Sequence, residues 1–220
     1  MNPVRVLVID DHPIVCESLA RMIDAEGDLE VVGTASKVDE AHRLFRKTKP
    51  DVLVVDIALA DAHGLELLQN LLAEDDRPAA IVYSMYDERT YAERAIRSGA
   101  LGYVMKNAPT RAILDAIRKA SRGEYYLSTP VLNRILRSMS RVNSASDDSP
   151  FANLTDRELE VYQLLGQGLD ILTIAQQLNL GRKTVETYRR RIKEKLELDT
   201  INELLQHAIQ WTHTQSRTRA

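Results

Sequence analysis

Residues 4–11 read VRVLVIDD, a short run of mostly apolar, β-branched residues that ends in two aspartates. A strand that is apolar at nearly every position is covered on both faces, which is typical of a parallel sheet. Runs of the same kind follow at 29–35, 52–55, 79–84 and 101–105. Amphipathic segments separate these runs. The first half of the chain therefore predicts an α/β domain with five βα units around a doubly wound parallel sheet.

Polar side chains stand where the apolar runs end. Asp10 and Asp11 follow the first run, Asp56 follows the third, Ser84 ends the fourth and Lys106 follows the fifth. The carboxyl ends of parallel strands meet at one edge of a sheet, so we expect these side chains to converge there. Three carboxylates at close range repel one another unless a cation is present, and Mg²⁺ prefers hard oxygen ligands. The pattern therefore predicts a magnesium site.

The composition is that of a globular protein, with 44% apolar and 28% charged residues among 220. The net charge is −3, from 29 Lys and Arg against 32 Asp and Glu, so any surface for nucleic acid must be a local patch. The chain contains no apolar run near the roughly 20 residues of a membrane span, and it begins without a signal-peptide core. We expect a cytoplasmic protein without membrane contact. A single cysteine excludes an intramolecular disulfide and a cysteine metal cluster.

Only helical patterns remain after Phe151. Thr155 and Glu158 have the spacing of a capping box, which predicts the start of a helix. A short second helix precedes Asn179, a residue type that tolerates a left-handed turn. A third helix is expected over 182–196, and a fourth follows it. This half therefore predicts a small all-α domain.

The two halves are joined by a segment of different character. Residues 129–142 have the pattern of a basic helix, and residues 143–150, NSASDDSP, are almost entirely polar. We therefore predict a first domain over 1–125, a linker with a helix over 126–150, and a second domain over 151–220.

The expected third helix carries most of the positive charge of the second half. Residues 182–195 contain seven Lys and Arg but only two Glu. Val185, Tyr188 and Ile192 fall on one side of this helix, and most of the cations fall on the other. A charged stripe by itself is usually only a solvated surface. Together with the preceding short helix and turn, it predicts a helix-turn-helix whose last helix fits the major groove of DNA.

The segment 3–125 resembles the receiver domain of two-component response regulators. The polar residues at its strand ends carry this resemblance. In that family one aspartate, here Asp56, accepts a phosphoryl group from a sensor histidine kinase. The resemblance implies four Mg²⁺ ligands: Asp10, Asp11, Asp56 and the backbone carbonyl of Ala58. It also implies that Lys106 and Ser84 bind phosphoryl oxygens and that Tyr103 is the aromatic that turns inward on activation.

Residues 154–210 resemble the LuxR-type DNA-binding domain. The resemblance is carried by Leu154-Thr155-Asp156-Arg157-Glu158, Ile174-Ala175, Thr184-Val185 and Lys195-Leu196. It implies three residues that reach base edges: Glu186, Thr187 and Arg190. Four further residues are expected to contact phosphates: Arg182, Lys183, Arg189 and Lys193.

The whole chain thus resembles a NarL/FixJ-family response regulator, with a flavodoxin-like receiver domain followed by a helix-turn-helix domain. The resemblance implies a transcription regulator that binds double-stranded DNA. Phosphorylation of Asp56 by a sensor histidine kinase would promote formation of a homodimer and promoter binding. It implies no enzymatic activity beyond the self-limited acceptance of a phosphoryl group and its hydrolysis.

The alternatives to this interpretation are an enzyme, either a phosphatase or a nucleotide triphosphatase, and a regulator that works without phosphorylation. Haloacid-dehalogenase-like phosphatases also form an aspartyl phosphate, but they need a second aspartate two residues after the nucleophile, where this chain has Ala58. A nucleotide triphosphatase would need a phosphate-binding glycine-rich loop, which the sequence lacks. A regulator with a vestigial receiver would work without phosphorylation. The complete set of polar residues at the strand ends argues against that class.

Overall fold

The computed structural model describes residues 2–74, 77–140, 151 and 153–217. The chain divides into two compact units, Met1–Val142 and Asn143–Ala220. The predicted polar linker over 143–150 lies outside the described residues. In the part that is described, no helix combines the length and the apolar character needed to cross a bilayer.

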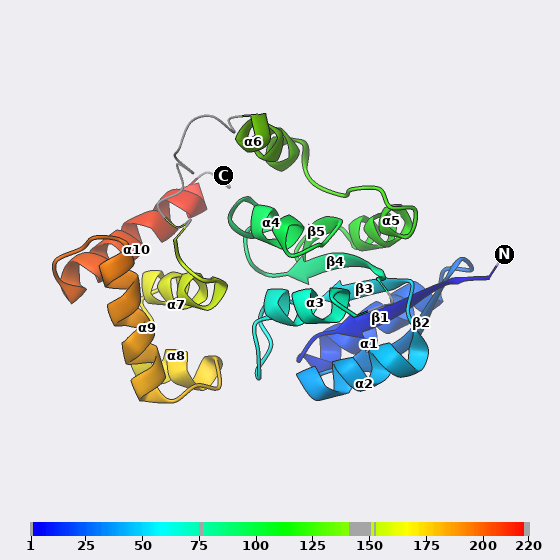
Figure 1. The fold of residues 1–220 in the computed structure, drawn as a ribbon, viewed down its shortest axis with the longest axis horizontal. Helices are drawn as coiled ribbons and strands as arrows, with labels where there is room; N and C mark the ends of the chain where they lie inside the picture. The colour runs from blue at the N-terminus through cyan, green and yellow to red at the C-terminus, as the bar shows by residue number, and fades with distance from the viewer. Residues whose placement is uncertain (1, 75–76, 141–150, 152, 218–220) are drawn as a thin grey trace. The chain divides into compact units, whose positions relative to one another are not determined.

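The first unit is built on a parallel five-stranded sheet with the order β2-β1-β3-β4-β5 (Figure 1). The strands are β1 (Val4–Ile9), β2 (Leu29–Ala35), β3 (Val52–Val55), β4 (Ala79–Ser84) and β5 (Gly102–Met105). Each of the five predicted strands is confirmed, and only β5 starts one residue later than expected. The predicted doubly wound sheet is therefore the observed one.

Helices cover both faces of this sheet. They are α1 (Pro13–Asp24), α2 (Val38–Thr48), α3 (Gly64–Leu72), α4 (Glu88–Arg97) and α5 (Thr110–Ser121), and α6 (Thr129–Ser140) follows them in the chain. One face of the sheet packs on α1 and α5, where Val8 and Val54 share a buried cluster with Leu19 and Ile117. Side chains alternate along a strand, so Leu7 points to the opposite face, where it approaches Leu44 of α2. Burial on both faces explains the nearly continuous apolar strands.

The predicted basic helix after the receiver-like segment is present as α6. It packs against α4 and buries Val131 and Ile135, and it belongs to the first compact unit. Its predicted last two residues, 141–142, lie outside the described residues.

The second unit consists of α7 (Asp156–Gly166), α8 (Ile171–Gln177), α9 (Arg182–Lys195) and α10 (Ile201–Arg217). The predicted capping box is confirmed: Glu158 N–H donates to the Thr155 hydroxyl at 3.3 Å, and Thr155 N–H donates to the Glu158 carboxylate at 2.8 Å. Asn179 has a φ of 49°, the predicted left-handed turn between α8 and α9. Local interactions, the helix cap and the Asn179 turn, thus determine where α7 begins and where the chain turns between α8 and α9.

Gly64 allows the loop after β3 to fold back over the strand end that carries Asp56. Its N–H donates to the Ile57 carbonyl at 2.7 Å, and a Cβ at this position would lie 1.8 Å from the Asp56 carbonyl oxygen. Because the clash is with backbone, a side chain here forces the loop away from the strand end.

We expect Gly64→Ala to lower the free energy of unfolding of the first unit by about 1–3 kcal/mol, since overpacking against backbone requires a shift of the chain. Gly27→Ala is the matched control, because a Cβ there has nothing within 4 Å. Urea unfolding followed by circular dichroism measures the first unit. Fluorescence of the single Trp211, in the second unit, should be unaffected by either variant. Equal stability of the two variants would contradict this account of Gly64.

Candidate functional site

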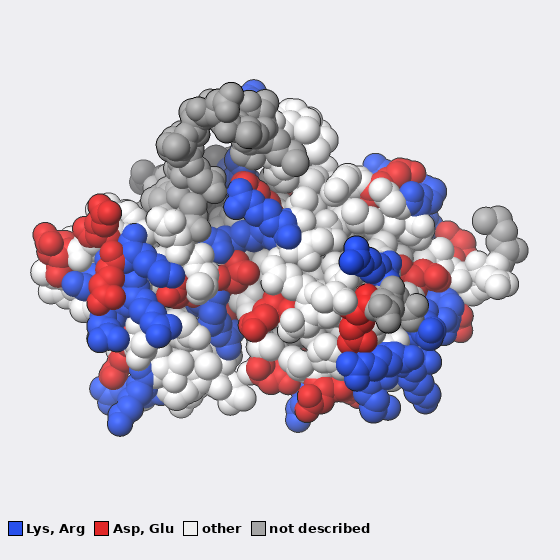
Figure 2. Space-filling view, viewed as in Figure 1, with Lys and Arg blue, Asp and Glu red and all other residues white. Residues whose placement is uncertain are grey.

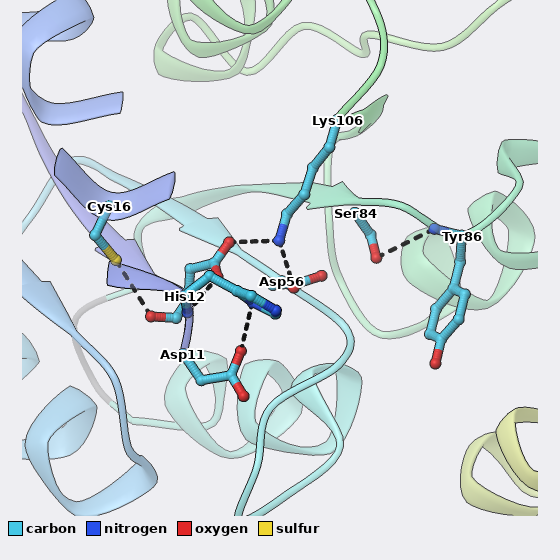
Figure 3. A network of polar contacts seen from close by, with 8 residues as sticks. Asp11, His12, Cys16, Asp56, Ser84, Tyr86 and Lys106 are labelled. Carbon is cyan, nitrogen blue, oxygen red and sulfur yellow. Dashed lines mark hydrogen bonds and ion pairs between the residues drawn. The ribbon is translucent and has the colours of Figure 1, made fainter. Parts of the chain in front are cut away.

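Polar side chains from four strand ends converge at the carboxyl edge of the sheet (Figure 3). The Lys106 ammonium lies 2.6 Å from Asp10 Oδ2 and 2.6 Å from Asp56 Oδ2. Asp10 follows β1, Asp56 follows β3, Lys106 follows β5 and Ser84 is the last residue of β4. The sheet order makes β1 and β3 neighbours, so their terminal carboxylates are forced into proximity.

This cluster is deeply buried for a group of charges. The side chains of Asp10, Asp56 and Lys106 are 2%, 3% and 8% exposed. Burial raises the pKa of Asp56 above its ordinary value even though the Lys106 ammonium opposes that effect. Burial alone would lower the pKa of Lys106, but the carboxylates of Asp56 and Asp10 outweigh it and raise that pKa. The lysine therefore remains charged and holds the two carboxylates together.

The acidic groups and donor atoms of this cluster suit the binding of a cation. Carboxylate oxygens of Asp10, Asp11 and Asp56 and a ring nitrogen of His12 all lie within 4.8 Å of one another. Within the described residues, the buried Asp56 Oδ1 has no hydrogen-bond partner. The cluster thus has three carboxyl groups against one ammonium. These donors fit the oxygen preference of Mg²⁺.

The other residues expected at this site come from the end of β4, from β5 and from the loop after β3. Ser84 is buried, and its Oγ accepts from the Tyr86 N–H at 3.5 Å. Tyr103 is 2% exposed and turned inward, and its hydroxyl donates to the Tyr86 carbonyl at 2.9 Å. Ala58 lies in the loop after β3, where it forms a backbone bridge with His63. The metal-binding role of the Ala58 carbonyl stays a prediction.

His12 is the residue at this site that the sequence reasoning missed. Its Nδ1 lies 2.8 Å from Asp11 Oδ1 and 3.1 Å from Asp10 Oδ1. The signal available was its position, directly after the acidic pair and before Pro13, which begins α1.

The apolar side of α9 packs into the second unit and its opposite side is open. Val185 and Ile192 are fully buried, whereas Arg182, Lys183 and Arg190 are exposed. Figure 2 shows Lys and Arg side chains gathered over this helix. The predicted division of α9 into a packed side and a basic side is thus observed.

Several residues expected to contact DNA have partners within α9 or shortly after its end. Glu186 accepts from Arg182 Nε at 3.0 Å, and the Thr187 hydroxyl donates to the Lys183 carbonyl at 2.9 Å. Lys193 Nζ donates to the Asp199 carbonyl at 3.2 Å. All three contacts are exposed, so they contribute little and can exchange for contacts with a ligand.

Arg189 and Arg190 differ in how far their side chains are exposed to solvent. Arg190 is 68% exposed, with its Nε 4.0 Å from Glu194 Oε1. Arg189 is half-buried, and its Nε is shielded from solvent without a hydrogen-bond partner in the described part of the chain. Arg190 is therefore the arginine of this pair that is more open to a ligand.

A partly buried ion pair and a hydrogen bond from an arginine hold α7 to the two helices that follow it. Lys195 of α9 donates to the Glu158 carboxylate at 2.6 Å, and Glu158 is 2% exposed. Arg157 pairs with Glu160 at 2.6 Å and donates to the Leu178 carbonyl at 3.0 Å. Lys195, one of the seven cations of the basic helix, is thus turned toward its own domain.

Comparison with known proteins gives matches over both units. Residues 6–118 match the family model described as the response regulator receiver domain. Residues 152–208 match the model described as bacterial regulatory proteins, luxR family. The oxygen regulatory protein NreC of Staphylococcus aureus (strain MRSA252) is 32% identical over 210 residues, which are 93% of this chain and 96% of that protein.

Solved structures agree with these matches. The response regulator ChrA of a heme-sensing two-component system is 31% identical, with a TM-score of 0.52 over 96% of this chain and 98% of that one. RcsB of Salmonella typhimurium is 22% identical, with a TM-score of 0.67 over 96% of this chain and 98% of that one, and supports the fold alone.

We expect Lys106→Met to destabilise the first unit by about 3 kcal/mol near neutral pH, because it leaves two buried carboxylates without their counter-charge. The pKa of Asp56, which burial already raises, would then rise further, so the loss should shrink toward about pH 4.5 as this group binds a proton. Urea unfolding at both pH values measures the effect. Lys47→Met, at an exposed position on α2, is the control. An equal loss at both pH values would contradict this electrostatic explanation.

Proposed function

The chain belongs to the response regulators that join a receiver domain to a LuxR-type DNA-binding domain, and we propose that phosphorylation of Asp56 controls its binding to promoter DNA. The observation that carries this proposal is the contact of one buried ammonium, Lys106, with the carboxylates of both Asp10 and Asp56 at 2.6 Å. A buried carboxylate beside a free donor set and a fixed cation is suited to accept a phosphoryl group.

The phosphoryl group would come from a phosphohistidine of the sensor kinase. An Asp56 carboxylate oxygen forms a bond to phosphorus while the P–N bond breaks, and the leaving imidazole nitrogen keeps the electron pair and takes up a proton. Asp56 Oδ1 is suited to this attack because it is buried and unpartnered among the described residues. Lys106, already 2.6 Å from the other oxygen, would neutralise charge on the phosphoryl group.

Asp10, Asp11 and Asp56, with the carbonyl of Ala58, would hold the magnesium ion that the family uses. When bound, Mg²⁺ supplies positive charge that stabilises the transferring phosphoryl oxygens. The acidic pocket and the oxygen donors of these residues support that assignment. Acceptance of the group and its later hydrolysis are the only reactions that we assign to the chain.

The consequence of phosphorylation would travel through Ser84. A phosphoryl group adds a charge of about −1.5 to −2 and three acceptor oxygens beside this hydroxyl. Ser84 Oγ now accepts from Tyr86 N–H, and the Tyr86 carbonyl accepts from Tyr103. Drawing Ser84 toward the phosphoryl group therefore moves the segment that anchors Tyr103. This change would alter the surface near α4 and favour the homodimer.

The DNA-binding half would place α9 in the major groove. Arg190 has the exposure and the fork of donors that suit guanine, and Glu186 and Thr187 would read cytosine and a thymine methyl. The exposed Arg182–Glu186 pair would have to open for that contact. Contacts to phosphate are assigned to Arg182, Lys183, Arg189 and Lys193. Binding to DNA and phosphorylation by a sensor kinase would both favour a cytoplasmic location.

Beryllofluoride with Mg²⁺ mimics the phosphoryl group and tests the central proposal. We expect it to shift the full chain toward dimer in sedimentation velocity and to raise its affinity, about tenfold or more, for DNA selected from a random library. Asp56→Asn should abolish both responses. Asp39→Asn, at an exposed position on α2, is the control and should respond like the unaltered chain. A response that survives in Asp56→Asn would contradict the role of Asp56.

Substitutions on α9 separate sequence reading from phosphate contact. Arg190→Ala should cost about 1–3 kcal/mol on the selected DNA and relax the preference at one base pair. Lys183→Ala should weaken binding to all sequences alike and lower the slope of log affinity against log salt by about 1. Fluorescence anisotropy at several salt concentrations measures both effects. If Arg190→Ala weakened binding uniformly, its role in base reading would be wrong.

A further inference from the structure

His12 lies at the open side of the acidic pocket, in a position set by the backbone. It is the N-cap residue of α1, with extended φ and ψ of −97° and 107°, and Pro13 follows as the first helical residue. Its own N–H donates to Asp10 Oδ1 at 2.9 Å. The local chain therefore holds the imidazole next to Asp10 and Asp11, and Figure 3 shows it beside Asp11.

One ring atom of His12 faces two carboxylates. Nδ1 lies 2.8 Å from Asp11 Oδ1 and 3.1 Å from Asp10 Oδ1. Adjacent ligands of an octahedral ion with bonds of about 2.1 Å are about 3 Å apart. His12 Nδ1 thus lies at the spacing of neighbouring ligands from each of the two carboxylate oxygens.

A second observation shows that this group of donors is incomplete as it stands. Asp56 Oδ1 belongs to a residue that is 3% exposed, and it has no hydrogen-bond partner among the described residues. A carboxylate oxygen of Asp56 and a ring nitrogen of His12 belong to the same set of donor atoms, all within 4.8 Å of one another. An ion in the pocket would satisfy Asp56 Oδ1, whereas the ring of His12 alone does not.

A nitrogen ligand changes which ion a pocket prefers. Mg²⁺ takes oxygen ligands and keeps several waters, so an imidazole adds little to its binding. First-row transition ions bind imidazole well, and their affinities for mixed nitrogen and oxygen sites rise from Mn²⁺ to Ni²⁺. A site with one imidazole beside three carboxylates therefore favours such ions more than an all-oxygen site does.

We propose that His12 is a direct ligand of the metal pocket through Nδ1, and that it raises the affinity of this pocket for transition-metal ions relative to Mg²⁺. The inference rests on the metal pocket of the proposed function. The ring is 63% exposed, so it closes the solvent side of the pocket while the three aspartates supply the inner side. The receiver would then be loaded by ions such as Mn²⁺ at concentrations where Mg²⁺ alone leaves it partly empty.

Calorimetric titration of the full chain with Mg²⁺, Mn²⁺ and Ni²⁺ tests the preference. We expect His12→Ala to weaken Ni²⁺ binding at least tenfold and Mn²⁺ binding several-fold, with Mg²⁺ changed less than about twofold. His213→Ala is the control, because it removes an exposed histidine of α10 and should leave all three affinities unchanged. Equal losses for the three ions in His12→Ala would overturn the proposal.

Electron spin-echo modulation of bound Mn²⁺ tests the bond itself. The unaltered chain should show coupling to an imidazole ¹⁴N, and His12→Ala should not. His12→Asn distinguishes a ligand from a residue that only positions Asp11, since its amide can take the place of Nδ1 as a hydrogen-bond partner. A positioning role predicts that His12→Asn restores the affinities, whereas ligation predicts that it restores neither Ni²⁺ affinity nor the nitrogen signal.

The role of His12 and the existence of the metal pocket can be tested separately. If Mg²⁺ binds and Asp10→Asn abolishes that binding, but no ¹⁴N coupling appears, the role of His12 is overturned and the pocket stands. If no ion binds, or if Asp10→Asn leaves binding unchanged, the pocket of the proposed function is overturned together with the role of His12.

Discussion

The Lys106 ammonium, in contact with the Asp10 and Asp56 carboxylates at 2.6 Å each, is the interaction on which the rest of the first unit depends. Two buried carboxylates at adjacent strand ends would otherwise repel one another and destabilise the sheet edge. The lysine comes from β5, two strands away from β3, so its contact ties three loops together. Among the described residues Asp56 Oδ1 has no hydrogen-bond partner, so this carboxylate oxygen stays available for reaction.

The two units use charge in different ways. In the first unit buried charges form the chemical site, and burial shifts the pKa of Asp56. In the second unit the pair of the buried Glu158 with Lys195 is structural, because it joins the capped start of α7 to the end of α9. The pairs on the open side of α9 are exposed and weak, so its cations can exchange partners for phosphate. The pair with the buried Glu158 thus stabilises the domain, whereas the exposed pairs of α9 leave its cations able to bind a ligand.

The acidic pocket has two different sides. On one side Ser84, Tyr86 and Tyr103 form a chain of hydrogen bonds that leads away from Asp56 toward α4. On the other side His12 faces solvent beside Asp10 and Asp11. The first side suits the transmission of a change at Asp56, and the second suits control of which ion enters. Both depend on backbone that is already fixed, at the end of β4 and at the N-cap of α1.

The sequence by itself determined the elements and their order. Apolar runs fixed the five strands, and the Thr155–Glu158 capping box and Asn179 fixed helix starts and a turn, because these signals act within a few residues. It also indicated that Asp10, Asp56, Ser84 and Lys106 would meet, since parallel strands end at one edge. Only the tertiary structure decided which atoms touch. The double contact of Lys106, the turn of Lys195 toward Glu158 and the place of His12 beside Asp11 depend on register, helix crossing and rotamer, which join residues far apart in the chain or select one orientation among several.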